Sequence, residues 1–207
     1  MQDKKKYEYW AVKAIILCIV VFILQQLIYP DFTNFFLLSQ DHPLQIWRYL
    51  TAIFLHGSLG HLVLNMFALG IFGSMLEKFI GRRFILVFLV SGIIANVISI
   101  NFYASSLGAS GAIFGIIGAL VIIRPTMAVW AFGLPMPMFL AAMLWAALDI
   151  IGYFNPSEIA NVAHLSGLAV GLIFGVLYRD WSSNQQRETR VIIDEDSMRR
   201  WEEQHLR

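Results

Sequence analysis

Apolar runs of roughly twenty residues recur along the whole chain, and this feature constrains the fold more than any other. A helix of about 20 residues crosses the hydrocarbon core of a bilayer, and inside that core the helix satisfies its own backbone hydrogen bonds. The composition agrees, because 58% of the 207 residues are hydrophobic and 14% are charged, whereas soluble domains carry about 25% charged residues. The sequence therefore predicts an all-α polytopic membrane protein and excludes a water-soluble domain.

Six segments fit membrane-spanning helices, and a polar stretch flanks them at each end. We expect the spans at Trp10–Tyr29, Leu59–Leu76, Phe84–Tyr103, Ser110–Ile123, Met136–Phe154 and Val162–Tyr178. The predicted organisation is a cytoplasmic N-terminal segment at residues 1–9, a six-helix membrane domain at residues 10–179, and a cytoplasmic tail at residues 180–207 that is helical in part. No small-residue cleavage site follows the first apolar run, so we expect it to be retained as a helix.

The basic residues predict the orientation, because cytoplasmic segments collect lysine and arginine. With six spans and the N-terminus inside, all of the 15 Lys and Arg residues except Arg48 fall on the inner side. We therefore expect both termini in the cytoplasm. We also expect the membrane to be a prokaryotic cell membrane. A net charge of +1 offers no basic surface for nucleic acid, and the single cysteine, Cys18, can form neither an intrachain disulfide nor a cysteine metal site.

The connection from Pro30 to His56 is too long for a plain loop. It mixes aromatic and charged residues, which favours short amphipathic pieces lying in the outer membrane interface. Within it, we expect Trp47 and Arg48 to anchor the loop at the lipid headgroups.

A few polar side chains stand inside the predicted spans, where burial in lipid is costly and a polar group suggests function. They are His61, Asn65, Ser110, Asp149 and His164. The second, fourth and sixth spans all run from outside to inside, so every member of this group except Asp149 lies near the outer end of its helix. Four chemically useful groups are thus predicted to share one layer of the membrane.

The fourth span is too short to reach the outer surface. Its 14 residues from Ser110 to Ile123 extend about 21 Å at 1.5 Å per residue, against a hydrocarbon core of about 30 Å. The chain must therefore turn back inside the membrane at residues 106–109. Irregular backbone at that depth requires a covering of protein or a hydrated cavity, and we expect a cavity that opens outward.

Glycines clear one face of the fourth span and one face of the sixth, which allows the two backbones to approach closely. These glycines are Gly108, Gly111, Gly115 and Gly118 in the fourth segment and Gly167, Gly171 and Gly175 in the sixth. His164 extends the glycine face of the sixth span by a step of three residues. The spacing therefore predicts that His164 points toward the fourth span and toward Ser110.

Together these groups have the chemistry of a nucleophile and its general base. Neutral His164 can accept the hydroxyl proton of Ser110 as the oxygen attacks a carbonyl carbon. The backbone N–H of Ser110 is free at a helix N-terminus, and His61 and Asn65, on one face of the second span, can supply further donors to an oxyanion. Asp149 lies fifteen residues before His164 on a different helix, and we do not expect it to complete a triad.

These motifs resemble those of the rhomboid intramembrane serine proteases. Residues 108–111 match the GxSG motif of that family, residues 163–171 resemble its AHxxGxxxG motif, and Trp47-Arg48 match the WR pair of its first loop. His56, His61 and Asn65 resemble its second-helix pattern, and the similarity extends in order and spacing from about Trp10 to Tyr178.

The resemblance implies a six-helix rhomboid-like bundle with a Ser110–His164 catalytic dyad, and an oxyanion site made by Ser110, His61 and Asn65. It implies no cofactor and no metal. It also implies cleavage of single-span membrane proteins in the lipid bilayer, near the outer end of their transmembrane segment. Phe114 matches an aromatic position of the family that stacks on the catalytic histidine.

Other membrane functions fit the residues less well. A metalloprotease needs an HExxH-like pair, which His56 and His61 do not form, and an aspartyl intramembrane protease needs a second carboxylate beside Asp149. A transporter would use paired broken helices, which the sequence lacks. The remaining alternative is a catalytically silent rhomboid-like protein that binds membrane-protein clients.

Overall fold

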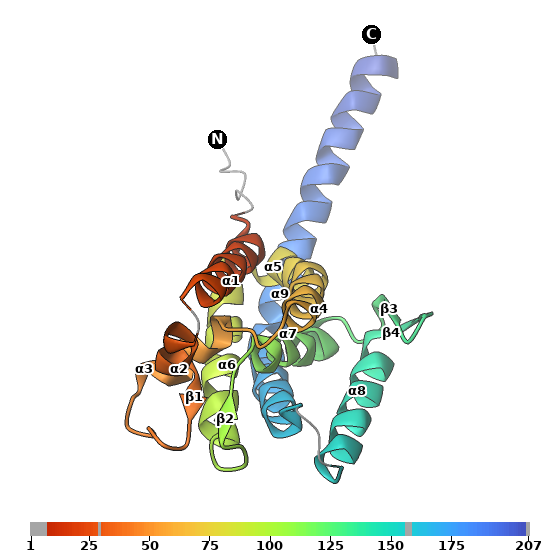
Figure 1. The fold of residues 1–207 in the computed structure, drawn as a ribbon. Coiled ribbons are helices and arrows are strands. Elements are labelled where there is room, and N and C mark those ends of the chain that lie inside the picture. Colours follow the sequence, from red (N-terminus) through yellow and green to blue (C-terminus); the bar gives the residue numbers. More distant parts are fainter. Residues whose placement is uncertain (1–7, 29, 156–158, 206–207) are drawn as a thin grey trace.

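The computed structural model describes residues 8–28, 30–155 and 159–205, with the side chains of residues 181–196 left undescribed. Long apolar helices dominate this part of the chain, and short helices and two small sheets connect them (Figure 1). Most of the predicted N-terminal segment, residues 1–7, lies outside the described residues.

The long helices follow the order of the predicted spans. They are α1 (Trp10–Leu27), α4 (Leu59–Ala68) with the π-helical turn η2 (Leu69–Gly73) and α5 (Ser74–Ile80), α6 (Phe84–Ser99), α7 (Ser110–Ile123), α8 (Met138–Tyr153) and α9 (Asn161–His205). The short helices are α2 (Asp31–Phe36), α3 (Trp47–Thr51), η1 (Ala52–Phe54) and η3 (Gly81–Arg83). Among the described residues, α1 begins and α9 ends toward the same end of the molecule (Figure 1).

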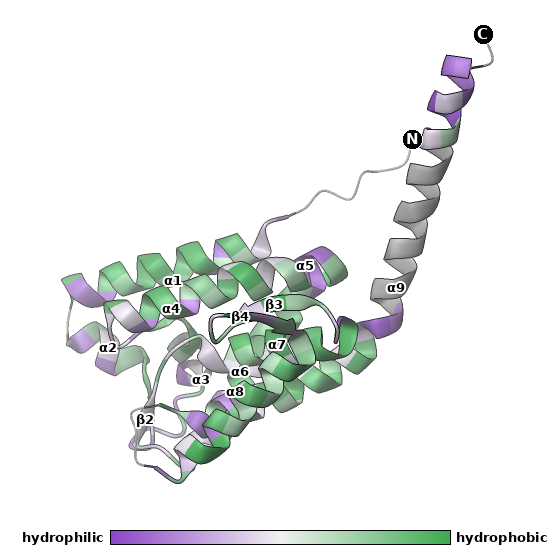
Figure 2. Cartoon of the chain, turned by 90° about the vertical axis from the view of Figure 1, so that its right-hand side faces the viewer, coloured by the Kyte–Doolittle hydropathy of each residue, from purple (hydrophilic) through white to green (hydrophobic). Residues whose placement is uncertain are grey.

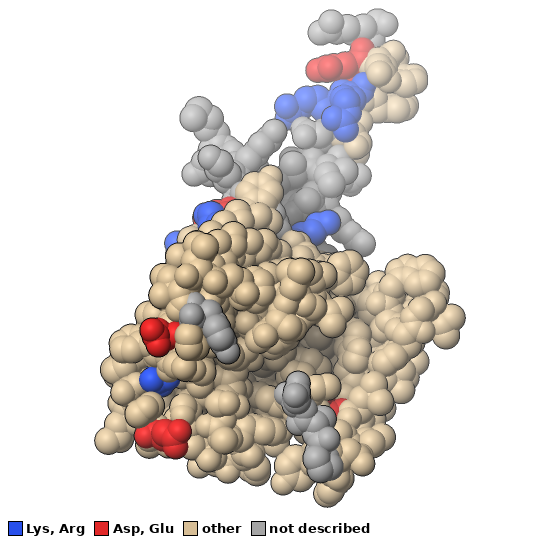
Figure 3. Space-filling model, in the orientation of Figure 1, with Lys and Arg blue, Asp and Glu red and all other residues tan. Residues whose placement is uncertain are grey.

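Three helical stretches are long and apolar enough to cross a membrane, by length and composition. They are Trp10–Leu27, Leu59–Ser99 and Asn161–Asp180, and Ser110–Ile123 and Met138–Tyr153 form two shorter apolar helices. Hydrophobic residues cover most of the helical bundle (Figure 2), and charged side chains are sparse on the face drawn in Figure 3. The count of six spans stays a prediction.

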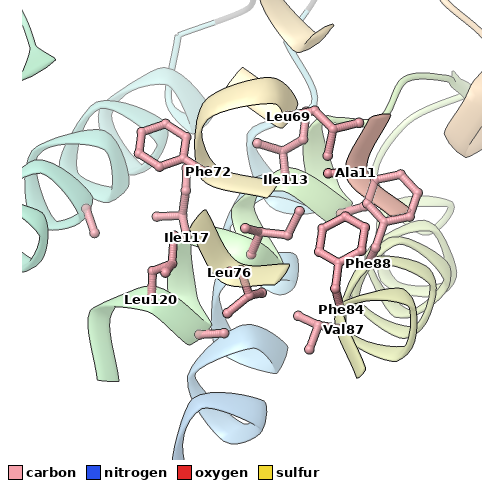
Figure 4. Packing of buried hydrophobic residues seen from close by; sticks show 14 of the residues in the cluster. Ala11, Leu69, Phe72, Leu76, Phe84, Val87, Phe88, Ile113, Ile117 and Leu120 are labelled. Atoms are coloured by element: carbon pink, nitrogen blue, oxygen red, sulfur yellow. The ribbon is translucent and has the colours of Figure 1, made fainter. Parts of the chain in front are cut away.

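The core lies where α7 passes through the middle of the bundle. Ten of its residues are buried, among them Ile113, Ile117 and Leu120, and these pack with Leu69 and Leu76 of the neighbouring helical segment (Figure 4). A helix that is apolar on all sides must be kept from water, by protein or by lipid, and protein surrounds α7 at these ten residues. The shortest of the predicted spans therefore forms the centre of the fold, and its N-terminal turn lies beside the start of α9, where a Cβ atom added at Gly111 would lie 3.4 Å from the carbonyl oxygen of Ala163.

Two small antiparallel sheets join parts of the chain that hydropathy did not predict to pair. Strand β1 (Leu38–Ser39) pairs with β2 (Ser105–Ser106), so the first loop is tied to the segment that leads into α7. Strands β3 (Ala128–Ala131) and β4 (Leu134–Pro137) form a hairpin before α8. Its turn places Phe132 and Gly133 at positive φ, as a two-residue hairpin turn requires.

The first loop is built around Arg48, which corrects the expectation that this residue reaches the lipid headgroups. Arg48 is only 4% exposed. Its guanidinium donates to the carbonyl oxygens of Asn34 at 2.7 Å and Leu37 at 2.6 Å, and to the side chain of Gln45 at 2.5 Å. A buried arginine requires such acceptors. The loop folds around the side chain, so Arg48 fixes the loop from within.

Helix α9 runs without a break from Asn161 to His205, so the sixth predicted span and the polar tail belong to one helix. At its start, the backbone N–H of Val162 donates to the hydroxyl of Tyr103 at 3.1 Å. A Cβ atom added at Gly152, near the end of α8, would lie 2.9 Å from the side-chain amide of Asn161. The end of α8 is therefore packed tightly against the start of α9.

Candidate active site

Ser110 opens helix α7 directly after a turn that only glycine accommodates well. Gly108 has φ +126°, a conformation that L side chains rarely adopt. Its backbone N–H donates to the carbonyl of Ala52 at 2.8 Å, which ties the turn to the end of the first loop. Ser110 itself is half-buried, and the first N–H groups of a helix have no acceptor within it.

His61 of α4 lies against this turn. A Cβ atom added at Gly108 would lie 2.7 Å from Cε1 and 2.9 Å from Nε2 of His61, so the missing side chain makes room for the imidazole. The hydroxyl of Ser58 caps α4 by accepting from the backbone N–H of His61 at 3.1 Å. The structure thus brings His61 next to the segment that carries Ser110, as the predicted oxyanion site requires.

His164 reaches the same region because α7 and α9 pack backbone to backbone. A Cβ atom added at Gly167 would lie 1.9 Å from the carbonyl oxygen of Gly111, and one added at Gly171 would lie 1.9 Å from that of Gly115. Any side chain at these positions would force the helices apart. The predicted approach of the two glycine faces is therefore confirmed, and we call this contact the glycine seam.

The ring of His164 stacks on the ring of Phe114, with centroids 4.4 Å apart and planes inclined by 7°. Phe114 lies one turn after Ser110 on α7. The stack therefore places the imidazole beside the N-terminal turn of α7, on the side where α9 packs. Among the described residues, no hydrogen bond joins Ser110 to His164.

Asp149 makes a contact that the sequence analysis did not expect. Its Oδ1 lies 2.9 Å from Nδ1 of His164, although the two residues are fifteen positions apart on different helices. Asp149 stands four residues before the end of α8, and His164 stands three residues after the start of α9. The chain reverses between these helices, so the two side chains come to one level, and Asp149 is a hydrogen-bond partner of His164 that the sequence did not predict.

Asn65 and His56 complete the wall formed by α4 and the first loop. Asn65 is buried, and its amide nitrogen donates to the carbonyl of His61 at 3.0 Å, which uses one of its two N–H groups. The backbone N–H of His56 donates to the side chain of Gln25 at 2.9 Å, and the ring of His56 lies 5.1 Å from that of His61. Burial, reinforced by the neighbouring His61, lowers the pKa of His56 to about 4.

His56 is therefore a neutral, buried support for His61. Among the described residues, no three His, Cys, Asp or Glu side chains gather closely enough to hold a metal ion.

Comparisons of the sequence with known proteins point to one family. The family model described as "Rhomboid domain" matches residues 43–181. The chain is 29% identical over 167 residues to the rhomboid protease GlpG of Haemophilus influenzae, an alignment that covers 78% of this chain and 86% of that protein. It is 31% identical over 164 residues to the rhomboid protease GlpG of Serratia proteamaculans, covering 76% of this chain and 58% of that protein.

A plant protein is similar as well. The mitochondrial RHOMBOID-like protein 6 of Arabidopsis thaliana is 33% identical over 135 residues, which cover 63% of this chain and 43% of that protein. The family model spans most of the chain, including the turn before Ser110, both helices of the glycine seam and Asp149. The apolar helices and these matches identify an integral membrane protein, and the chain belongs to the rhomboid family of intramembrane serine proteases.

Proposed function

We propose that this chain hydrolyses peptide bonds in or near the outer end of single-span transmembrane proteins, with Ser110 as nucleophile and His164 as general base. The observation that carries the proposal is the pair of contacts that fix the His164 side chain. Its ring stacks on Phe114, one turn after Ser110, and its Nδ1 is engaged by Asp149. With Nδ1 engaged by Asp149, Nε2 would be the basic nitrogen available to Ser110.

In the proposed reaction, Nε2 of His164 takes the hydroxyl proton of Ser110 while the serine oxygen forms a bond to the substrate carbonyl carbon. The tetrahedral intermediate then expels the amine of the scissile bond, which receives the proton from the imidazolium. An acyl ester on Ser110 remains. Water, deprotonated by His164, attacks this ester, and the departing serine oxygen recovers a proton from the same nitrogen.

The oxyanion of the intermediate would be stabilised by donors already gathered around the turn. The backbone N–H of Ser110 lies at the positive end of the α7 dipole. His61 packs on Gly108 in the same turn, and Asn65 lies one helical turn further along α4 with its second N–H still to be used. Donors held in place before the reaction are the condition for strong electrostatic stabilisation.

The proposed orientation places both termini in the cytoplasm and the starts of α4, α7 and α9 toward the outer side. It rests on the positive-inside bias of the sequence, and α1 begins and α9 ends at one end of the molecule, as an even number of spans requires (Figure 1). The site would then lie below the outer surface, where the end of a substrate helix can unwind.

Covalent labelling tests the proposal without knowledge of the substrate. The detergent-purified protein is treated with a fluorescent fluorophosphonate, and labelling is compared with that of Ser110→Ala and His164→Ala. We expect labelling of the wild type and its complete loss in Ser110→Ala, with at least a 100-fold slower rate in His164→Ala. Ser166→Ala serves as matched control, because its hydroxyl donates to the carbonyl of Val162 on α9 and has no part in the reaction.

Labelling that persists in Ser110→Ala would refute the nucleophile. Absence of labelling in a folded wild type would favour the silent rhomboid-like protein that binds membrane-protein clients, because that alternative shares the fold and predicts no change on replacing Ser110.

A further inference from the structure

The contact between Asp149 and His164 gives the general base a third partner. Asp149 is 6% exposed in a helix of otherwise apolar residues, and an ionisable side chain in such a helix carries a large cost unless it is paired. Its Oδ1 is 2.9 Å from Nδ1 of His164. A carboxylate can only accept a hydrogen bond, so Nδ1 must carry the proton, and in a neutral imidazole Nε2 is then the free base.

We propose that Asp149 is a positioning residue, which selects the Nδ1–H tautomer of His164, fixes the direction of its ring, and stabilises the imidazolium formed when Ser110 gives up its proton. This inference rests on the proposed function of Ser110 and His164. It extends the dyad to a triad in which the serine lies on α7, the histidine on α9 and the aspartate on α8.

The stacking of His164 on Phe114 cannot by itself select the tautomer of His164 or fix the direction of its ring. The two rings are almost parallel, at 7°, and turning the imidazole by 180° about its Cβ–Cγ bond would keep the stack while placing Cδ2 where Nδ1 lies and Cε1 where Nε2 lies. The stack therefore fixes the plane of the ring and leaves its flip undetermined. The bond to Asp149 distinguishes the two flips, because only one of them puts a nitrogen that bears a proton beside the carboxylate.

A second buried carboxylate shows what a purely structural role looks like in this chain. Both oxygens of Glu77 accept backbone N–H groups at the start of α1, from Trp10 at 2.9 Å and from Ala11 at 3.0 Å. Asp149 differs, because its Oδ1 binds His164 while its Oδ2 is buried without a hydrogen-bond partner among the described residues. A carboxylate placed only to join two helices would gain more from bonds to both oxygens.

The tautomer of His164 is measured directly by NMR of protein labelled with ¹⁵N-histidine in detergent micelles. The signal of His164 is assigned by its loss in His164→Ala. We expect the Nδ1–H tautomer in the wild type and a shift toward Nε2–H in Asp149→Asn, since an amide can both donate and accept and no longer selects one form. An Nε2–H tautomer in the wild type would overturn the proposal before any variant is made.

Kinetics of labelling by the fluorophosphonate provide the second readout. The maximal rate and the half-saturating concentration are measured for Asp149→Asn, Asp149→Ala and the control Glu77→Gln. We expect the maximal rate to fall at least about tenfold in both Asp149 variants, while the half-saturating concentration stays within about threefold. Glu77→Gln should lower the melting temperature without changing the rate or the tautomer of His164.

The outcomes separate this inference from the function on which it rests. Labelling that depends on Ser110 but proceeds at the wild-type rate in Asp149→Asn would overturn the role of Asp149 alone. A slower rate with an unchanged tautomer would also overturn it, because Asp149 would then act only through helix packing. Loss of the Ser110 dependence itself would instead refute the proposed function.

Discussion

Helices α8 and α9 both contribute to the candidate site, yet they are held to α7 in opposite ways. Along the glycine seam, α9 touches the backbone of α7, so that an added Cβ would lie 1.9 Å from a carbonyl oxygen. Helix α8 buries only four residues, Met138, Ala141, Ala142 and Asp149. Most of its large side chains are exposed, including Met143 at 63% and Leu148 at 54%.

This contrast separates the rigid pair of helices, α7 and α9, from α8, which has more freedom to move. The proposed nucleophile and base lie on the two helices that cannot shift without a clash, which suits chemistry that tolerates little misplacement. The carboxylate proposed to orient the base lies on a helix that buries only four of its 16 residues. Movement of α8 would therefore loosen the hold on His164 while leaving its stack on Phe114 of α7 in place.

The largest expected effect comes from breaking the seam. In Gly167→Ala the new Cβ meets a backbone oxygen that cannot turn aside, so we expect a loss of about 3 kcal/mol or more in the free energy of unfolding and loss of fluorophosphonate labelling. The matched control is Gly70→Ala, where the nearest atom to the added Cβ is a side-chain carbon of Ile15 at 3.7 Å. Thermal unfolding in detergent compares the two, and equal melting temperatures would show that the seam can open without cost.

A smaller effect is expected at Asn65, which lies outside the seam on α4. Asn65→Ala removes one proposed oxyanion donor but neither reacting group, so we expect the labelling rate to fall by about 10²-fold, short of the complete loss in Ser110→Ala. The comparison sharpens the distinction between groups that react and groups that assist. A loss as complete as that of the serine would mean that Asn65 holds the site together, and an unchanged rate would remove it from the oxyanion site.

Sequence patterns predicted the approach of the helices that carry the proposed pair, because the glycine spacing that forms the pattern is also what permits the close packing. Glycines at steps of three and four residues allow close helix packing, and His164 continues their face. The short length of the fourth apolar segment likewise predicted that Ser110 lies below the surface. Each of these predictions uses only the length of one helix or the glycine faces of two helices. Neither requires knowledge of how the loops turn.

The partners of Arg48 and Asp149 were missed because they depend on how the chain turns. Arg48 was expected at the headgroups, but the first loop curls so that two of its carbonyl groups face the guanidinium. Asp149 was set aside for its distance in sequence from His164. The distance that matters is the one from each residue to the end of its own helix. Asp149 lies four residues before the end of α8 and His164 lies three residues after the start of α9, so the two residues are at the same level when the helices run antiparallel.

The smallest effect is expected on the exposed face of α8, and it tests whether that helix is as loosely held as its burial indicates. Met143→Ala removes a large side chain that is 63% exposed, so no cavity forms in the protein. We expect a change within about 0.5 kcal/mol in the free energy of unfolding and an unchanged labelling rate. Ala141→Met is the matched variant on the opposite face, where Ala141 is fully buried, and overpacking there should cost about 1–3 kcal/mol. If both variants behaved alike, α8 would have no fixed inner face, and a hydrogen bond from that face could not orient His164.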